Sequence, residues 1–124
     1  MQSQQTVRKN YIFEGKGLHT GRYARMTVCP APEDTGIVFR RTDLGEDALV
    51  PALAENVSNT ARSTTISSGN TSVSTIEHIL SALTGMGVDN AYIDIDNVEV
   101  PILDGSAKPY IDAIWKDGFE VQDA

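Results

Sequence analysis

Cysteine, histidine, aromatic side chains and long apolar runs are all scarce in this sequence. The single cysteine, Cys29, excludes a disulfide within the chain and is typical of a protein from a reducing compartment. No apolar run approaches the ~20 residues of a membrane-spanning helix. The first ten residues lack the apolar core of a signal peptide. We therefore expect a cytoplasmic protein without a transmembrane segment.

Basic residues are also in the minority. Ten Lys and Arg stand against 17 Asp and Glu, which gives a net charge of −7 and a pI near 4.6. Nucleic acids and anionic membranes both attract basic surfaces, so this charge argues against either as a partner. The rest of the composition, 40% hydrophobic and 22% charged over 124 residues, predicts one globular domain covering residues 1–124.

Glycine, proline and polar turn residues divide the chain into about seven short strands, a weaker one around Pro51, and two helices. Three glycines between Glu14 and Gly21 predict a loop that joins the first two strands. Asp96 and Asn97 predict a hairpin between residues 91–95 and 98–100. The expected strands cover residues 4–13, 23–29, 37–41, 48–53, 63–67, 71–73, 91–95 and 98–100.

The helices are expected at residues 73–85 and at about 109–116. Ile111, Ile114 and Trp115 form the expected buried stripe of the second helix. Two amphipathic helices on one face of a sheet built from hairpins make an α+β fold. We predict a two-layer sandwich of a mostly antiparallel sheet backed by two helices, with a small subsidiary sheet around residues 37–60.

The start of the first helix carries the most informative residues. Glu77 and His78 lie in its first turn, away from the apolar stripe. In one interpretation, which the pattern alone favours, Ser74 and Glu77 form a capping box and His78 is an ordinary exposed residue. Apolar residues at i, i+3, i+4 and i+7 mark the buried stripe: Ile76, Ile79, Leu80 and Leu83.

The second interpretation is part of a catalytic site. The positive end of a helix favours a neutral imidazole, which can bind a metal ion, and a neighbouring carboxylate is the usual general base of metal-assisted hydrolysis. A catalytic zinc takes three protein ligands. Besides His78, the chain offers only His19, Cys29 and scattered carboxylates. Any metal site is therefore incomplete, and the other ligands would come from another domain, another chain or the substrate.

His19 lies on the glycine-rich loop, which also contains Lys16. The loop lacks the spacing of a phosphate-binding P-loop, and it joins two strands rather than a strand and a helix. We interpret it first as a hairpin connection and second as a functional loop.

Six segments in order make the chain similar to the N-terminal half of the UDP-3-O-acyl-N-acetylglucosamine deacetylase family, zinc amidases of lipid A biosynthesis. They cover nearly the whole chain, and together they are far more specific than any one of them. The segments are GKGLHTG at residues 15–21, PAP with TGIVFR at 30–32 and 35–40, NTARSTT at 59–65, VSTIEH at 73–78, GVDNA at 87–91 and PILDGSA at 101–107.

The resemblance implies two similar α+β domains that face each other, with the active site between them. This chain resembles the first domain. By position, Glu77 matches the general base and His78 the first zinc ligand, while a His and an Asp of the second domain supply the other two ligands. His19 matches a supporting residue of the site, and Asp104 belongs to a motif that we interpret as structural. Residues that match the lining of the acyl-sugar channel are Ala61, Arg62 and Ser63.

The resemblance also implies a reaction. One Zn²⁺ per complete enzyme would assist hydrolysis of the N-acetyl group from UDP-3-O-(3-hydroxyacyl)-N-acetylglucosamine, an enzyme activity of Gram-negative bacteria. Without the C-terminal domain, we expect this chain to be inactive, to hold zinc weakly and to self-associate through the exposed interdomain face. The alternative is a free-standing, non-catalytic binding or assembly module of the same fold.

Overall fold

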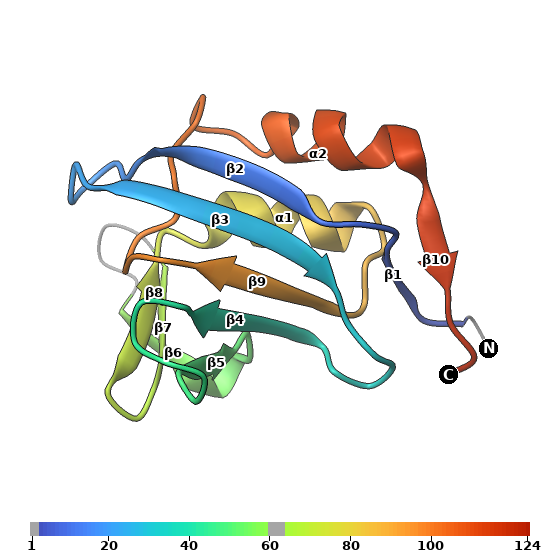
Figure 1. Ribbon diagram of the computed structural model, residues 1–124, viewed down its shortest axis with the longest axis horizontal. Coiled ribbons are helices and arrows are strands. Elements are labelled where there is room, and N and C mark those ends of the chain that lie inside the picture. The colour runs from blue at the N-terminus through green and yellow to red at the C-terminus, as the bar shows by residue number, and fades with distance from the viewer. Residues whose placement is uncertain (1–2, 60–63) are drawn as a thin grey trace.

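Alternating apolar residues build a five-stranded sheet at the centre of the molecule. The computed structural model describes residues 3–59 and 64–124. Each strand of the central sheet pairs antiparallel with its neighbours, except for the parallel β9–β4 pair. In spatial order the strands are β2 (Tyr11–Lys16), β3 (Tyr23–Pro30), β9 (Ala91–Ile95), β4 (Ile37–Arg41) and β5 (Leu49–Pro51) (Figure 1).

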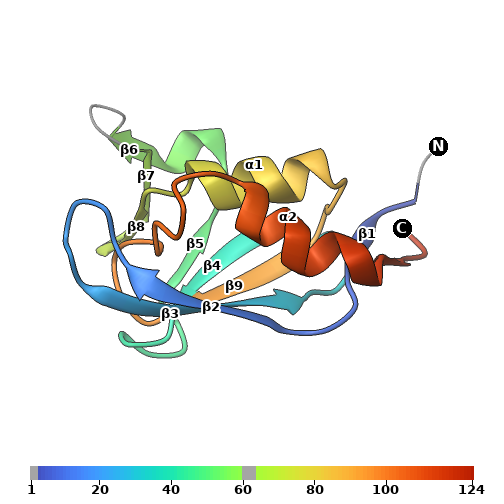
Figure 2. The same cartoon turned by 90° about the horizontal axis from the view of Figure 1, so that it is seen from above.

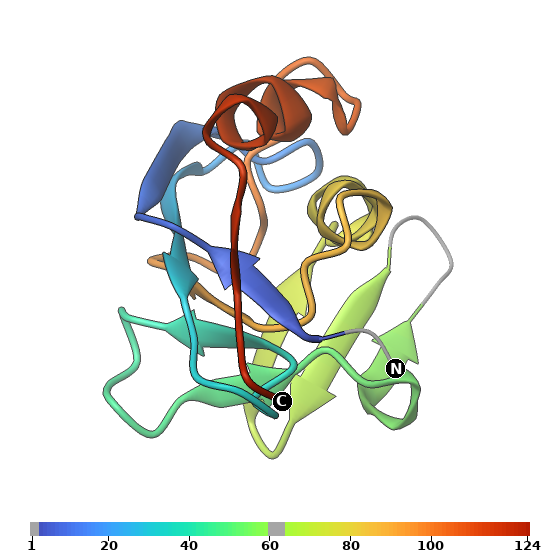
Figure 3. The same cartoon turned by 90° about the vertical axis from the view of Figure 1, so that its right-hand side faces the viewer.

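Two helices cover one face of this sheet, α1 (Glu77–Gly85) and α2 (Lys108–Ile114) (Figure 2). They lie side by side and are both seen nearly end-on in Figure 3. The buried stripe of α1 packs on the inward residues of the sheet, such as Phe39 and Ile93, each 0% exposed. The predicted α+β sandwich is confirmed. Neither helix among the described residues is long and apolar enough to cross a membrane.

Two smaller sheets flank the central one. β1 (Gln5–Val7) pairs with β10 (Phe119–Val121), and β7 (Thr65–Ser68) lies between β6 (Val57–Asn59) and β8 (Thr71–Ser74). Short 3-10 turns occupy Ala54–Asn56 and Trp115–Asp117.

The predicted place of the subsidiary sheet, around residues 37–60, is wrong for most of that range. β4 and β5 belong to the central sheet, where they bury Phe39 and Val50 completely. The subsidiary sheet is instead β6–β7–β8, between Val57 and Ser74. The sequence pattern did not show that β4 belongs to the central sheet, because β4 joins it through a parallel pairing with β9, more than 50 residues later in the chain.

The predicted hairpin of residues 91–95 with 98–100 is also wrong. β9 has β3 on one edge and β4 on the other, so no edge is left for residues 98–100. These residues run beside the end of β8 instead: the Ser74 N–H donates to the Val98 carbonyl at 2.7 Å, and the Val100 N–H donates to the Ser74 carbonyl at 3.1 Å. This pairing turns Glu99 into the protein, where it is 2% exposed.

The second helix buries a different aromatic residue from the one expected. Tyr110 is 1% exposed, whereas Trp115 is 60% exposed and lies in the 3-10 turn after the helix. The Tyr110 ring packs edge-on against Phe13 of β2, with 4.7 Å between centroids. Tyr110 and Ile114 are four residues apart and form the actual buried stripe, and Trp115 lies about 100° away from Ile114 around the helix.

Candidate functional site

The first helix begins at Glu77, later than the pattern predicts, because Ser74 ends strand β8. Between them Thr75 has a φ of +63°, an unusual conformation for a β-branched residue. The Thr75 N–H donates to the Thr64 carbonyl at 2.8 Å. The predicted Ser74–Glu77 capping box is not formed, since Ile76 occupies the cap position and no side chain caps the helix.

The Glu77 carboxylate is held from outside its own helix. Its Oε1 accepts a 2.6 Å hydrogen bond from the backbone N–H of Thr64, just before β7. Glu77 and His78 are both partly exposed, while the opposite side of α1 is buried through Ile79, Ala82 and Leu83. The structure therefore places a carboxylate and an imidazole side by side on the outward part of the first helical turn.

The glycine-rich loop is the connection between β2 and β3, as its residues predict. The two strands stay paired as far as Lys16 and Tyr23, so the loop is shorter than residues 14–21. It is closed by two backbone hydrogen bonds, from Gly17 N–H to the Arg22 carbonyl at 2.9 Å and from Gly21 N–H to the Gly17 carbonyl at 3.1 Å. The His19 residue within it is exposed.

Glu99 joins this loop to the segment that leads into α1. Its carboxylate accepts hydrogen bonds from the Thr75 hydroxyl at 2.6 Å, from the Thr20 N–H at 2.8 Å and from the His19 N–H at 3.1 Å. Burial acts to raise the pKa of Glu99, but the hydrogen bonds from Thr75, Thr20 and His19 outweigh it and hold the pKa below its usual value. No ion pair within the described residues involves Glu99.

Gly17 is required beside this carboxylate. A Cβ atom on Gly17 would lie 2.2 Å from Glu99 Oε1 and 2.8 Å from Thr20 Oγ1, closer than atoms can approach. Gly15, two residues earlier, has ordinary space: the nearest atoms to its Cβ would be those of Pro101 and Leu103, at 3.6 and 3.7 Å. Of these two glycines, only Gly17 lies too close to Glu99 to carry a Cβ atom.

This difference predicts the outcome of two alanine substitutions. We expect Gly17→Ala to lower the free energy of unfolding by about 1–3 kcal/mol, because the added methyl displaces the Glu99 carboxylate. Gly15→Ala is the matched control, and it is expected to leave stability unchanged or raise it by up to about 1 kcal/mol. Urea unfolding of the 124-residue chain measures both. Equal losses for the two variants would contradict the tight contact at Gly17.

The remaining predicted site residues fall in two places. Ala61, Arg62 and Ser63 lie outside the described residues. Asp104 is exposed, and its Oδ1 accepts hydrogen bonds from the Ser106 N–H at 2.9 Å and the Ser106 hydroxyl at 2.7 Å. This is the hydrogen bonding of an Asx turn, and the next residue, Gly105, has a φ of +80°.

The donor set at the helix start fits part of a zinc site. His78 supplies an imidazole, a common zinc ligand, and Glu77 supplies a carboxylate. Within residues 3–59 and 64–124, no group of three or more His, Cys, Asp or Glu side chains is arranged to hold a metal ion. Cys29 is a poor further ligand, because burial and then the charge of Asp94 raise the pKa of its thiol.

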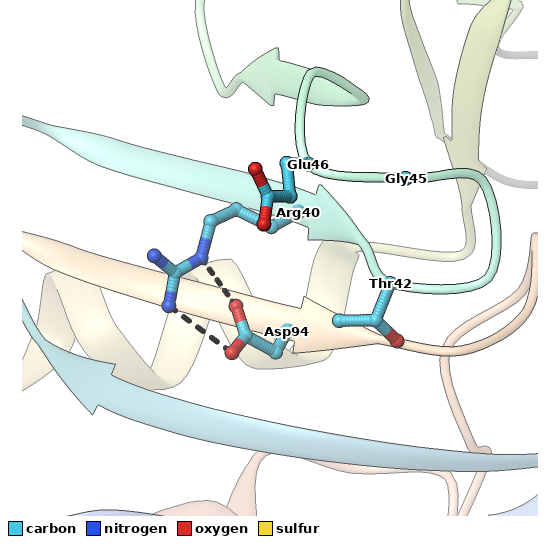
Figure 4. Close-up of a pocket in the computed structure, with 5 residues that line it drawn as sticks. All are labelled: Arg40, Thr42, Gly45, Glu46 and Asp94. Atoms are coloured by element: carbon cyan, nitrogen blue, oxygen red, sulfur yellow. Dashed lines mark hydrogen bonds and ion pairs between the residues drawn. The ribbon is translucent and has the colours of Figure 1, made fainter.

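A shallow hollow of about 490 Å³ lies elsewhere, lined by Arg40, Thr42, Gly45, Glu46 and Asp94 (Figure 4). Asp94 alternates with the inward Ile93, so the hollow is on the sheet face away from the helices. Arg40 is bound there by both Asp94 oxygens and lies 4.0 Å from the centre of the Tyr92 ring. Because its guanidinium is already engaged, this hollow is a weak candidate for binding an anion.

Sequence reasoning missed three residues that organise the helix start: Thr64, Thr75 and Glu99. Nothing in the residues around Glu99 shows that its side chain turns inward. The one available signal was the glycine-rich loop, since a glycine often marks a close approach of another group. The glycine indicates that some group approaches closely at Gly17, but it does not indicate which group. That group is Glu99, 82 residues later in the chain.

Comparison with known proteins gives a consistent result over almost the whole chain. A family model described as LpxC, UDP-3-O-acyl N-acetylglycosamine deacetylase, matches residues 4–124. A curated UDP-3-O-acyl-N-acetylglucosamine deacetylase of Citrifermentans bemidjiense is 53% identical over 118 residues, which are 95% of this chain and 39% of the relative. The protein of that name from Pseudomonas entomophila is 49% identical over 121 residues, 98% of this chain and 40% of the relative.

A longer relative shows the same match. The bifunctional enzyme LpxC/FabZ of Porphyromonas gingivalis is 47% identical over 123 residues, which are 99% of this chain and 27% of the relative. The chain therefore spans 27–40% of the length of these three relatives.

Proposed function

Because this chain belongs to the UDP-3-O-acyl-N-acetylglycosamine deacetylase family, we propose that it carries one part of a zinc-dependent deacetylase site. The substrate would be UDP-3-O-(3-hydroxyacyl)-N-acetylglucosamine, and the products acetate and the free amine, in lipid A biosynthesis. The observation that carries this proposal is the adjacent Glu77 and His78 on the outward side of the first turn of α1. We place the reaction in the cytoplasm, a reducing compartment that suits the lone Cys29.

Each residue has a definite role in this proposal. His78 would hold the zinc ion, which when bound polarises the acetamide carbonyl and makes water a stronger acid. Glu77 takes a proton from the attacking water and passes it to the amine nitrogen as the C–N bond breaks. Thr64 keeps the Glu77 carboxylate in place through its N–H. His19 would support the site from the β2–β3 loop, and Ala61, Arg62 and Ser63 would line the acyl-sugar channel.

The proposal includes a second domain. The described residues offer one imidazole at the helix start and no three-ligand group, and the relatives are more than twice as long as this chain. We infer that a further domain, of the kind that the relatives' extra length would hold, supplies the other two zinc ligands. On its own, residues 1–124 would then be inactive and would bind zinc weakly.

Metal removal tests the reaction class. In a form of the enzyme that releases acetate from the UDP-sugar substrate, we expect a chelator to abolish turnover and added Zn²⁺ to restore it. Turnover that survives complete zinc removal would overturn the metal role. For residues 1–124 alone, we expect no acetate release and no tight zinc binding by calorimetry. Activity of this chain alone, lost on chelation, would overturn the need for a second domain.

A further inference from the structure

Glu99 is the one carboxylate in the described part of the chain that is almost completely buried, at 2% exposed. Burying a charge is costly unless hydrogen bonds compensate it. Here the compensation comes from two separate parts of the chain, the His19–Thr20 backbone and the Thr75 side chain. The Glu99 carboxylate therefore joins these two segments through hydrogen bonds, and it forms no ion pair within the described residues.

One of these segments contains His19, and the other is followed directly by the helix that begins with Glu77. His19 itself donates its N–H to both Glu99 oxygens, at 3.1 Å each. Thr75 is two residues before Glu77, and its strained φ of +63° needs support from its surroundings. Two hydrogen bonds provide this support: the Thr75 hydroxyl donates to the Glu99 carboxylate, and the Thr75 N–H donates to the Thr64 carbonyl. Thr64 also donates to Glu77, so one continuous network runs from the loop to the helix start.

We propose that Glu99 is a positioning residue: its buried carboxylate holds the β2–β3 loop against the segment that leads into α1 and sets where His19 lies relative to Glu77 and His78. This inference rests on the proposed deacetylase function for its catalytic consequence. The hydrogen bonds from His19 and Thr20 and the close approach of Gly17 hold the loop over the carboxylate. Glu99 itself would not touch the substrate: it acts through the position of His19 and, by way of Thr75 and Thr64, through that of Glu77.

Glu99→Gln tests this in the 124-residue chain without any turnover. The substitution keeps the shape of the side chain but removes its charge, and it leaves one neutral acceptor oxygen where two charged oxygens receive hydrogen bonds from His19, Thr20 and Thr75. We expect faster hydrogen exchange at the His19 and Thr20 amides, measured by NMR, while the amides of β9 remain protected. Glu120→Gln, on exposed β10, is the control and should change neither. Unchanged exchange at His19 and Thr20 in Glu99→Gln would overturn the proposal.

A double-mutant cycle in an acetate-releasing form of the enzyme tests the link to His19. We expect Glu99→Gln to lower kcat by about 10- to 100-fold, as misplaced catalytic groups do, with KM nearly unchanged. His19→Ala should lower kcat too, and Glu99→Gln should lower kcat by a smaller factor in the His19→Ala background than in the unaltered enzyme. Losses that multiply, or a His19→Ala variant with full activity, would overturn the proposal. If the unaltered enzyme releases no acetate, the proposed function fails, and the exchange experiment still decides whether Glu99 holds the loop.

Discussion

Glu77→Gln is expected to lower the kcat of deacetylation by about 10²–10⁴-fold, the usual contribution of a general base. The amide has nearly the shape of the carboxylate, and its oxygen can still accept the 2.6 Å hydrogen bond that Thr64 donates. It does not take a proton from water. Substrate binding and folding should therefore be nearly unchanged, so that the loss falls on kcat rather than on KM.

Steady-state acetate release, together with thermal unfolding, measures this effect. Glu120→Gln is the matched control, since it removes the same charge from an exposed strand and is expected to keep full activity. His78→Ala should also abolish turnover, and it should additionally release zinc, which Glu77→Gln should not. Full activity of Glu77→Gln would exclude Glu77 as the base. A large loss of stability instead would mean that Glu77 is mainly a structural link to Thr64.

The elements that the sequence predicted correctly depend on local patterns. The strand at residues 23–29 was readable because Ala24, Met26 and Val28 alternate with polar neighbours, and all three are 0% exposed. The stripe of the first helix was readable for the same reason, through Ile76, Ile79 and Leu83. In these segments the side-chain periodicity and the buried face agree, so no information from elsewhere in the chain is needed.

The errors share a different cause, which is pairing between distant residues. The Ser74–Glu77 spacing fits a capping box. However, Ser74 is the last residue of β8, and its backbone forms hydrogen bonds with Val98 and Val100. The same long-range pairing turns Glu99 inward and prevents the expected hairpin with β9. The candidate site thus has two origins. The groups proposed to react, Glu77 and His78, can be recognised in the sequence, whereas the hydrogen-bond network around them exists only in the folded chain.

Tyr110→Ala is expected to have the largest effect on stability, a loss of about 3–5 kcal/mol in the free energy of unfolding. The Tyr110 ring is 1% exposed and packs edge-on against Phe13, and its hydroxyl donates to the Pro101 carbonyl at 3.3 Å. Burial also raises the pKa of this hydroxyl, which remains a neutral donor. Alanine would leave a cavity between α2 and β2 and an unsatisfied carbonyl at Pro101, two residues after Glu99.

Trp115→Ala is the control for this packing effect, because it also removes a large aromatic side chain, from the turn that follows α2. Trp115 is 60% exposed, and its ring approaches Phe119 edge-on with 5.9 Å between centroids. We expect a loss below about 1.5 kcal/mol, measured by urea unfolding of both variants. A Trp115→Ala loss as large as that of Tyr110→Ala would contradict the observed packing. Because Tyr110 anchors the segment that contains Glu99, its loss should also speed amide exchange at His19 and Thr20, and Trp115→Ala should not.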